Sequence, residues 1–313
     1  RSTQAKTLFP YTTLFRSLAL PEPVRTFFYN HIDFVTQEST VPDLRKYTLR
    51  DNAEKPRHYI DLENYGNSDT IPRTLELAKK KYDEKFLSSN GILPWYIQDV
   101  MVKLTKAFKD KRKTEILFLA ADLGHYIGDA HMPLHTAVNH DGLLTNQKGI
   151  HALWEARIPE MFGKDYNFHT EDAKYITNIE ATTWSIINDS HSLIAPLLLA
   201  DKNLRDAIGV DKMYNLDSKG GIAKNKFNDL IHTDEYVKKY NQALNGMVEK
   251  QLRKAIVMTS SYWYTAWVNA GKPDLSSLDT PEQTERNKGN LKADLKLWSQ
   301  GKLFGLESEK DFD

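Results

Sequence analysis

The chain has 313 residues, 40% of them hydrophobic, which is enough for a sizeable core in one or two domains. Lysine plus arginine and aspartate plus glutamate number 42 each, so the formal net charge is zero and no global basic field would attract a polyanion. No apolar run approaches the roughly 18 residues of a membrane span, and the absence of cysteine excludes disulfides and thiolate ligands without deciding the compartment.

The chain begins with a segment that we set aside. Residues Thr7 to Ser17 read TLFPYTTLFRS, which resembles a translated sequencing-adapter primer. We therefore treat residues 1–17 as a non-native scar and exclude them from the fold prediction, as one would a fusion scar. On this interpretation the true N-terminus, with any signal peptide, is missing.

Apolar residues at spacings of three and four predict helices through most of the chain, whereas β-branched alternation is scarce. The segment from Thr114 is apolar around much of its circumference, so we expect that helix at the centre of a bundle. Pro133 should end it, since the residue before a proline is biased out of the helical region. These patterns predict an all-α fold. The predicted helices span residues 71–88, 94–110, 113–131, 149–160, 181–208 and 234–269.

The composition changes after Pro273 to serine, threonine, glutamine and charged residues. Such a segment buries little apolar surface. We expect residues 276–313 to form a polar, loosely attached extension with a short helix near Leu291 to Trp298.

Candidate metal ligands are concentrated in the sequence GHYIGDAHMPLHTAVNHDGLLTNQKGIHALWE. His125 with Asp129, and His151 with Glu155, are spaced i, i+4, so each pair projects from one face of a helix and can bind one ion. A lone pair of this kind is more often a surface hydrogen bond or a buried, satisfied histidine. Two pairs plus His135 are harder to explain in that way. Imidazole and carboxylate ligands without thiolate favour zinc, and their number suggests more than one ion.

Further candidates lie upstream and between the pairs. The sequence VPDLRKYTLRDNAEKPRHYIDLENYG supplies Asp43 and, fifteen residues later, His58. His131 and His140 fit neither helical pair, and we interpret them as supporting or surface residues.

The pattern of an aspartate, then PRHYID, then HYIGDxHxPLH, then GxHxxWE resembles the superfamily that joins bacterial zinc-dependent phospholipase C to the single-strand-specific zinc nucleases of fungi and plants. The resemblance covers the chain from about Leu18 to about Leu275. It implies a bacterial enzyme with a single helical-bundle domain over residues 18–275, which holds three zinc ions at the base of a cleft. It assigns to one zinc Asp43, His58, His125 and Asp129, and to a second zinc His135, His151 and Glu155, with Asp129 also bridging to a third.

The third ion marks a departure from the family. Its other ligands in the family are the amino group and carbonyl of an N-terminal tryptophan and a histidine shortly after it. Neither precedes Leu18, and the first histidine, His31, is too far along the chain. We therefore expect two zinc ions to bind firmly and a third weakly or not at all.

The resemblance implies a zinc-dependent phosphodiesterase in which metal-activated hydroxide attacks phosphorus. Asp43 is the best candidate to orient the water or take its proton. Glu155 and its flanking motifs favour the phospholipase C branch, whereas Tyr59, after His58, favours the nucleases, in which an aromatic residue there can stack on a base.

Balanced charge favours a phospholipase-C-like enzyme acting on phospholipid. The alternatives are a nuclease acting on single-stranded nucleic acid and a non-catalytic, zinc-stabilised helical protein. We also expect a monomer without a transmembrane segment, secreted or periplasmic as the resemblance implies.

Overall fold

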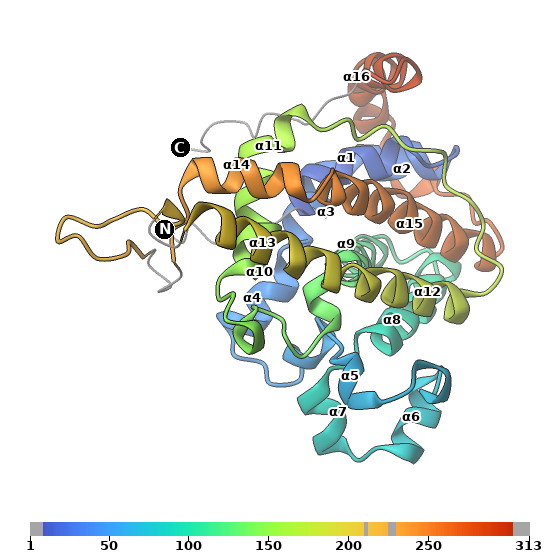
Figure 1. The fold of residues 1–313 in the computed structure, drawn as a ribbon. Coiled ribbons are helices and arrows are strands. Elements are labelled where there is room, and N and C mark those ends of the chain that lie inside the picture. The colour runs from blue at the N-terminus through green and yellow to red at the C-terminus, as the bar shows by residue number, and fades with distance from the viewer. Residues whose placement is uncertain (1–8, 210–211, 225–229, 303–313) are drawn as a thin grey trace.

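Helix α9 (Lys113–His131) runs through the centre of an all-α domain (Figure 1). The computed structural model describes residues 9–209, 212–224 and 230–302. Helix α9 packs against α3 (Ile32–Glu38), α8 (Leu93–Lys109), α12 (Ile179–Ser192) and α15 (Met247–Asn269), and buried residues occur along most of its length. Its predicted central position is confirmed. Within the described ranges, β structure is limited to isolated bridges, most of them in the segment between α13 and α14.

The remaining helices between residues 71 and 269 lie in the predicted regions but divide some of them, whereas the helices before residue 71 were not predicted. Predicted helix 71–88 is two helices because the Asp83 side chain accepts a hydrogen bond from Phe86 N and so begins a new helix. Predicted helix 234–269 is divided at Gly246, which has a φ of 73°. Predicted helix 181–208 is divided at Leu193. These other helices are α1 (Phe9–Leu18), α2 (Val24–Asn30), α4 (Val41–Tyr47), α5 (Leu62–Tyr65), α6 (Leu75–Lys81), α7 (Glu84–Asn90), α10 (Ile150–Ala152), α11 (Ile158–Phe162), α13 (Ile194–Ile208), α14 (Asp234–Ala243) and α16 (Pro281–Ser299).

Helix α15 connects two hydrophobic clusters. Its C-terminal half packs with α8 and α9 in the first cluster, and its N-terminal half packs with α1 and α14 in the second. Within the first cluster, Trp263 joins α15 to α2 and α9, because its ring stacks on Phe28 with centroids 4.3 Å apart and its Nε1 donates to the Ala120 carbonyl at 3.0 Å. The central helix is therefore held by both apolar packing and a buried hydrogen bond.

The C-terminal segment differs from the loose extension expected. Helix α16 is longer than the predicted 291–298, and Trp298 is buried. Tyr29 donates to Asp294 at 2.6 Å, and His31 Nε2 lies 2.6 Å from Asp279 Oδ1. Contacts between polar side chains attach this segment to α2. Apolar periodicity in the sequence does not predict contacts of that kind.

Helix α1 crosses the boundary predicted at residue 17. Leu14, Phe15 and Leu18 are buried in the second cluster, and the helix contacts α2, α3 and α15. Residues 9–17 therefore take part in the fold described here. That they are not native to the protein stays a prediction.

Arg16 is an anomaly within α1. Its side chain is fully buried, and its Nε and Nη1 atoms have no hydrogen-bond partner among the residues that the structure describes. The guanidinium lies so close to α9 that a Cβ on Gly124 would be 2.6 Å from Nη1. Burial lowers the pKa of Arg16 to about 9. A buried cation without partners destabilises the folded state.

We expect Arg16→Met to raise the free energy of unfolding by roughly 1–3 kcal/mol, because it removes unsatisfied buried donors and keeps an unbranched side chain. Urea denaturation of the two proteins measures the difference. Arg112→Met is the matched control, since Arg112 is exposed, and it should change stability by less than about 0.5 kcal/mol. A loss of stability in the Arg16 variant would contradict the expectation.

Candidate metal centre

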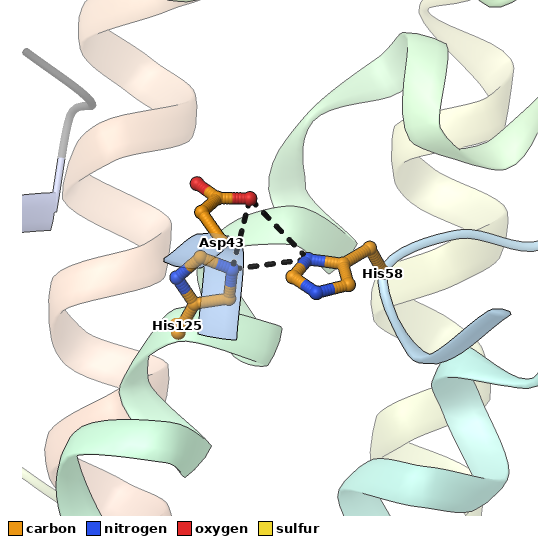
Figure 2. Close-up of side chains that lie close together, drawn as sticks. All are labelled: Asp43, His58 and His125. Carbon is orange, nitrogen blue, oxygen red and sulfur yellow. Dashed lines mark hydrogen bonds and ion pairs between the residues drawn. The ribbon is translucent and has the colours of Figure 1, made fainter. Parts of the chain in front are cut away.

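Three side chains from separate segments converge: Asp43 from α4, His58 from the residues after the turn η1 (Lys55–Arg57), and His125 from α9. His58 Nδ1 and His125 Nε2 lie 3.1 Å apart. Asp43 Oδ1 lies 3.8 Å from His58 Nδ1 and 4.0 Å from His125 Nε2. Figure 2 shows the three side chains pointing toward one another. Their ligand atoms are close enough together to bind a single ion.

Asp129 joins this first group to a second one. It lies one helical turn after His125, and its Oδ2 is 3.3 Å from His125 Nε2 and 3.0 Å from His58 Nδ1. Its other oxygen, Oδ1, is 3.1 Å from His135 Nδ1. Asp129 is almost fully buried, with its side chain 2% exposed. It presents one oxygen to each group.

The second group consists of His135, His151 and Glu155. His151 Nε2 is 2.8 Å from Glu155 Oε2, and His135 Nε2 is 3.3 Å from His151 Nε2. His135 lies on the short turn Pro133–Thr136, which begins where Pro133 stops α9. The structure thus brings all seven predicted ligands together in two linked groups. Their role as zinc ligands stays a prediction.

The predicted α-helix under His151 and Glu155 is interrupted. Helix α10 ends at Ala152, and Leu153–Arg157 form a π-type turn. Pro159 has no N–H for the Glu155 carbonyl, which breaks the regular α-helical ladder at this place. π-Type turns are rare and occur frequently at functional sites.

The outward-facing nitrogens of two histidines are held by backbone carbonyls. His125 Nδ1 donates to the Ser39 carbonyl at 2.8 Å, and His151 Nδ1 donates to the His140 carbonyl at 2.9 Å. With the proton on Nδ1, the Nε2 lone pair of each neutral ring faces its ligand group. This is the tautomer that a metal ligand requires.

The charges of both groups suit a cation. Burial lowers the pKa of His125, but Asp129 and Asp43 outweigh burial and raise it to about 9. Burial opposes the charge of Glu155, yet His151 lowers the pKa of Glu155 to about 2. Buried carboxylates thus draw protons onto neighbouring imidazoles. Zinc binds imidazole nitrogen and carboxylate oxygen and can replace such protons, so the residues present fit zinc.

Residues of both groups line a cleft of about 840 Å³, whose wall also contains basic residues that were not predicted from the sequence. Lys46, Arg50 and Lys55 lie in its wall. Lys46 is three residues after Asp43 on α4, and its Nζ lies 4.6 Å from the centroid of the Tyr47 ring. The i, i+3 spacing from a predicted ligand is a signal that identifies Lys46 in retrospect. Arg50 and Lys55 follow α4 and offered no such spacing.

Tyr59, the predicted base-stacking residue, lies in the cleft wall. Its hydroxyl donates to the Ser89 carbonyl at 3.0 Å, and its own carbonyl accepts from Leu93 N at 3.2 Å. Gly91 has a φ of 82°, and a Cβ there would lie 2.1 Å from the Tyr59 oxygen. Only glycine fits this close approach, so the chain around Gly91 fixes the position of Tyr59.

The other histidines named in the sequence analysis lie outside both groups. His131 is buried, donates from Nδ1 to the Ile127 carbonyl at 2.7 Å, and has a pKa that burial lowers to about 4. His140 is exposed in the cleft wall, where its backbone supports His151. His31 is paired with Asp279 near α16.

An all-α domain with linked histidine and carboxylate groups in an open cleft has the features of a metal-dependent hydrolase of phosphate esters. The sequence matches the S1/P1 nuclease family over residues 21–258, which is more than half of the chain and includes all seven predicted ligands. The protein belongs to this family. Comparison with individually curated proteins gives no match. Membership confirms the predicted superfamily and makes the protein a member of a family of phosphodiester hydrolases, but it gives no specific support to phospholipase C.

We expect zinc binding to weaken as the pH falls, because a proton on His125, whose pKa is raised to about 9, must leave before the metal binds. The apparent affinity should change by about tenfold per pH unit for each proton displaced. Calorimetric titration with zinc in buffers of different ionisation enthalpy counts the protons released. Affinity independent of pH between about pH 6 and about pH 8, without proton release, would contradict this expectation.

Proposed function

We propose that the protein is a zinc-dependent nuclease that hydrolyses phosphodiester bonds in single-stranded nucleic acid. The observation that carries the proposal is the pair of ligand groups, linked through Asp129, in a cleft whose wall also carries Lys46, Arg50 and Lys55. When bound there, zinc would lower the pKa of a water molecule to about 7 and offset charge on the phosphate. The family match favours this substrate over phospholipid.

Asp43 is the residue best placed to act on the attacking water. Its side chain is 24% exposed, whereas that of Asp129 is 2% exposed. Its Oδ1 also lies farther from His58 and His125 than the Asp129 oxygen does. A carboxylate at the edge of the group can accept a proton from water, while the buried carboxylate serves only to hold ions.

The basic residues of the wall are suited to the phosphate backbone. Burial lowers the pKa of Lys46, but Tyr47 and Asp43 outweigh burial and raise it, so that the ammonium group stays charged. Arg50 and Lys55 are exposed along the same wall. Cations at intervals along a cleft bind successive phosphates without reading sequence.

Tyr59 supports the preference for single strands. It lies next to the predicted ligand His58 and is fixed from behind by the chain around Gly91. An aromatic side chain stacks on any base, but only a base that is free of a duplex can reach it. We therefore propose that the Tyr59 ring stacks on the base next to the reacting phosphate.

We further propose two firmly bound zinc ions, one in each ligand group, and a monomeric, secreted or periplasmic enzyme. The ion count rests on the two groups around Asp129. None of the described helices is long and apolar enough to cross a bilayer.

Parallel hydrolysis assays on single-stranded DNA, double-stranded DNA and phosphatidylcholine, each with and without chelator, test the substrate. We expect chelator-sensitive cleavage of single-stranded DNA. Asp43→Asn should lower kcat by about 10²–10⁴-fold because it removes the proton acceptor, and should leave the ion of the second group bound. Asp99→Asn, at a half-buried position on α8 outside the cleft, is the control and should keep full activity.

Each other result has a definite meaning. Cleavage of phosphatidylcholine alone would establish the phospholipase C alternative. Bound zinc without hydrolysis of any substrate would establish the non-catalytic alternative. Normal turnover by the Asp43 variant would reject the role assigned to that residue.

Lys46→Gln should raise KM for single-stranded DNA and flatten the dependence of log KM on log salt concentration by about one unit, since one phosphate contact is lost. Lys103→Gln is the matched control, because Lys103 is an exposed lysine on α8 that pairs with Asp99 at 2.7 Å. Its KM and salt dependence should equal those of the unsubstituted protein. An equal salt dependence in both variants would remove Lys46 from the substrate path.

A further inference from the structure

Glu54 is a fully buried carboxylate behind the first ligand group. It lies directly before η1 and four residues before His58. Its Oε2 accepts hydrogen bonds from Arg45 Nε at 2.9 Å and from Arg57 Nη1 at 2.8 Å, and its Oε1 accepts one from the Tyr126 hydroxyl. A buried carboxylate with three donors is held in one position.

The same carboxylate faces the outer nitrogen of His58. Glu54 Oε1 lies 3.4 Å from His58 Nε2, while His58 Nδ1, on the other side of the ring, faces Asp43 and Asp129. The ring is therefore placed between a fixed carboxylate and the first ligand group. The contact is within ion-pair distance, although His58 Nε2 makes no hydrogen bond among the described residues. A proton on Nε2 would face Glu54 and leave the Nδ1 lone pair for an ion.

This support differs from that of the other histidines. The outer nitrogens of His125 and His151 face backbone carbonyls, whereas that of His58 faces a charged oxygen. A carboxylate beside the outer nitrogen makes the imidazole more basic. His58 is also the ligand that needs such support, since it lies outside any long helix, directly after η1.

Arg45 extends the contact to the other segments of the group. Besides Glu54, it contacts Asp122 at 2.8 Å and the Tyr126 hydroxyl at 3.1 Å, both on α9. Arg45 is itself two residues after Asp43 on α4. The charges around Glu54 thus connect the three segments that carry the first ligand group.

We infer that Glu54 is a positioning residue for the metal centre, which acts through His58 and sets the affinity of the first ligand group for its ion. The inference rests on the metal-dependent part of the proposed function. It adds a partner on the far side of His58 that does not itself touch the ion. Groups that hold the outer nitrogen of a metal-binding histidine typically change metal affinity by about 10–100-fold when replaced.

Zinc titration against a chromophoric chelator, without any substrate, tests the inference. His58→Ala and His151→Ala first identify which binding step belongs to which group. Glu54→Gln should then raise the dissociation constant of the first-group ion by about 10–100-fold and leave that of the second-group ion unchanged. Because nothing is hydrolysed in this experiment, its result is independent of whether the substrate is nucleic acid.

Asp201→Asn is the matched control for general destabilisation. Asp201 is also a fully buried carboxylate, and it accepts from Arg205 Nε at 2.6 Å and from the Tyr236 hydroxyl at 2.5 Å, outside both ligand groups. Its replacement should lower the melting temperature as Glu54→Gln does but leave the first-group ion as tightly bound as before.

Glu54→Asp keeps the charge that the two arginines need but draws the carboxylate away from His58 by one methylene. It should fold even where Glu54→Gln does not, and it should still weaken the first-group ion. Unchanged affinity in either folded variant, or an equal loss of first-group affinity in the Asp201 control, would overturn the inference.

Discussion

The structure depends on a carboxylate buried in the last turn of its central helix. Asp129 lies near the C-terminal end of α9, where the helix already carries partial negative charge, so its ionised side chain is unfavourable unless positive charge surrounds it. Burial raises the pKa of Asp129, but the neighbouring His125 and His135 outweigh burial and lower it well below its usual range. A divalent cation on each side of the carboxylate would do the same more strongly. The buried position of Asp129 therefore requires positive charge around it. This requirement explains why predicted metal ligands from distant segments lie around this one residue.

The ligands that are not on α9 are held in place by short, specific contacts. His135 follows a proline-terminated helix, and its carbonyl accepts from Ile60 N at 2.9 Å, which ties the chain beyond His58 to the turn after α9. On the other side of His58, Glu54 Oε1 lies 3.4 Å from the ring, and Arg45 holds Glu54 in place. These contacts are made by backbone groups and buried charged side chains and not by apolar side chains of the core. Such an arrangement restricts the ligand side chains to a narrow range of positions, which favours metal affinity because little ordering remains to be done on binding.

The central helix and four of the ligands could be predicted because they depend on local spacing, whereas the full ligand set was predicted from the resemblance to the family. The apolar circumference of α9 placed it in the core, and the i, i+4 pairs identified four of the ligands. The remainder depends on contacts between distant residues. Helix α16 is attached through Asp279 and Asp294, which look like solvent-exposed residues in the sequence, and the role of Glu54 appears only when its contacts with Arg45 and Arg57 are known. The π-type turn at Leu153–Arg157 follows from the missing N–H of Pro159, which leaves the Glu155 carbonyl without its α-helical partner. The spacing of ligands along the sequence does not predict such a turn.

Net charge was the weakest ground for choosing a substrate, and the cleft shows why. At physiological ionic strength the Debye length is about 8 Å. A polyanion in the cleft therefore interacts with the charges of the cleft wall and not with the net charge of the whole chain. Lys46, Arg50 and Lys55 contribute cations to the cleft wall beside Asp51 and Asp61, and other acidic residues are paired with lysines on other surfaces, as on α8. Zinc in the two ligand groups would add further positive charge in the cleft. A chain of zero net charge can therefore bind a nucleic acid strand wherever its local field is positive, provided that the affinity decreases with salt as local screening requires.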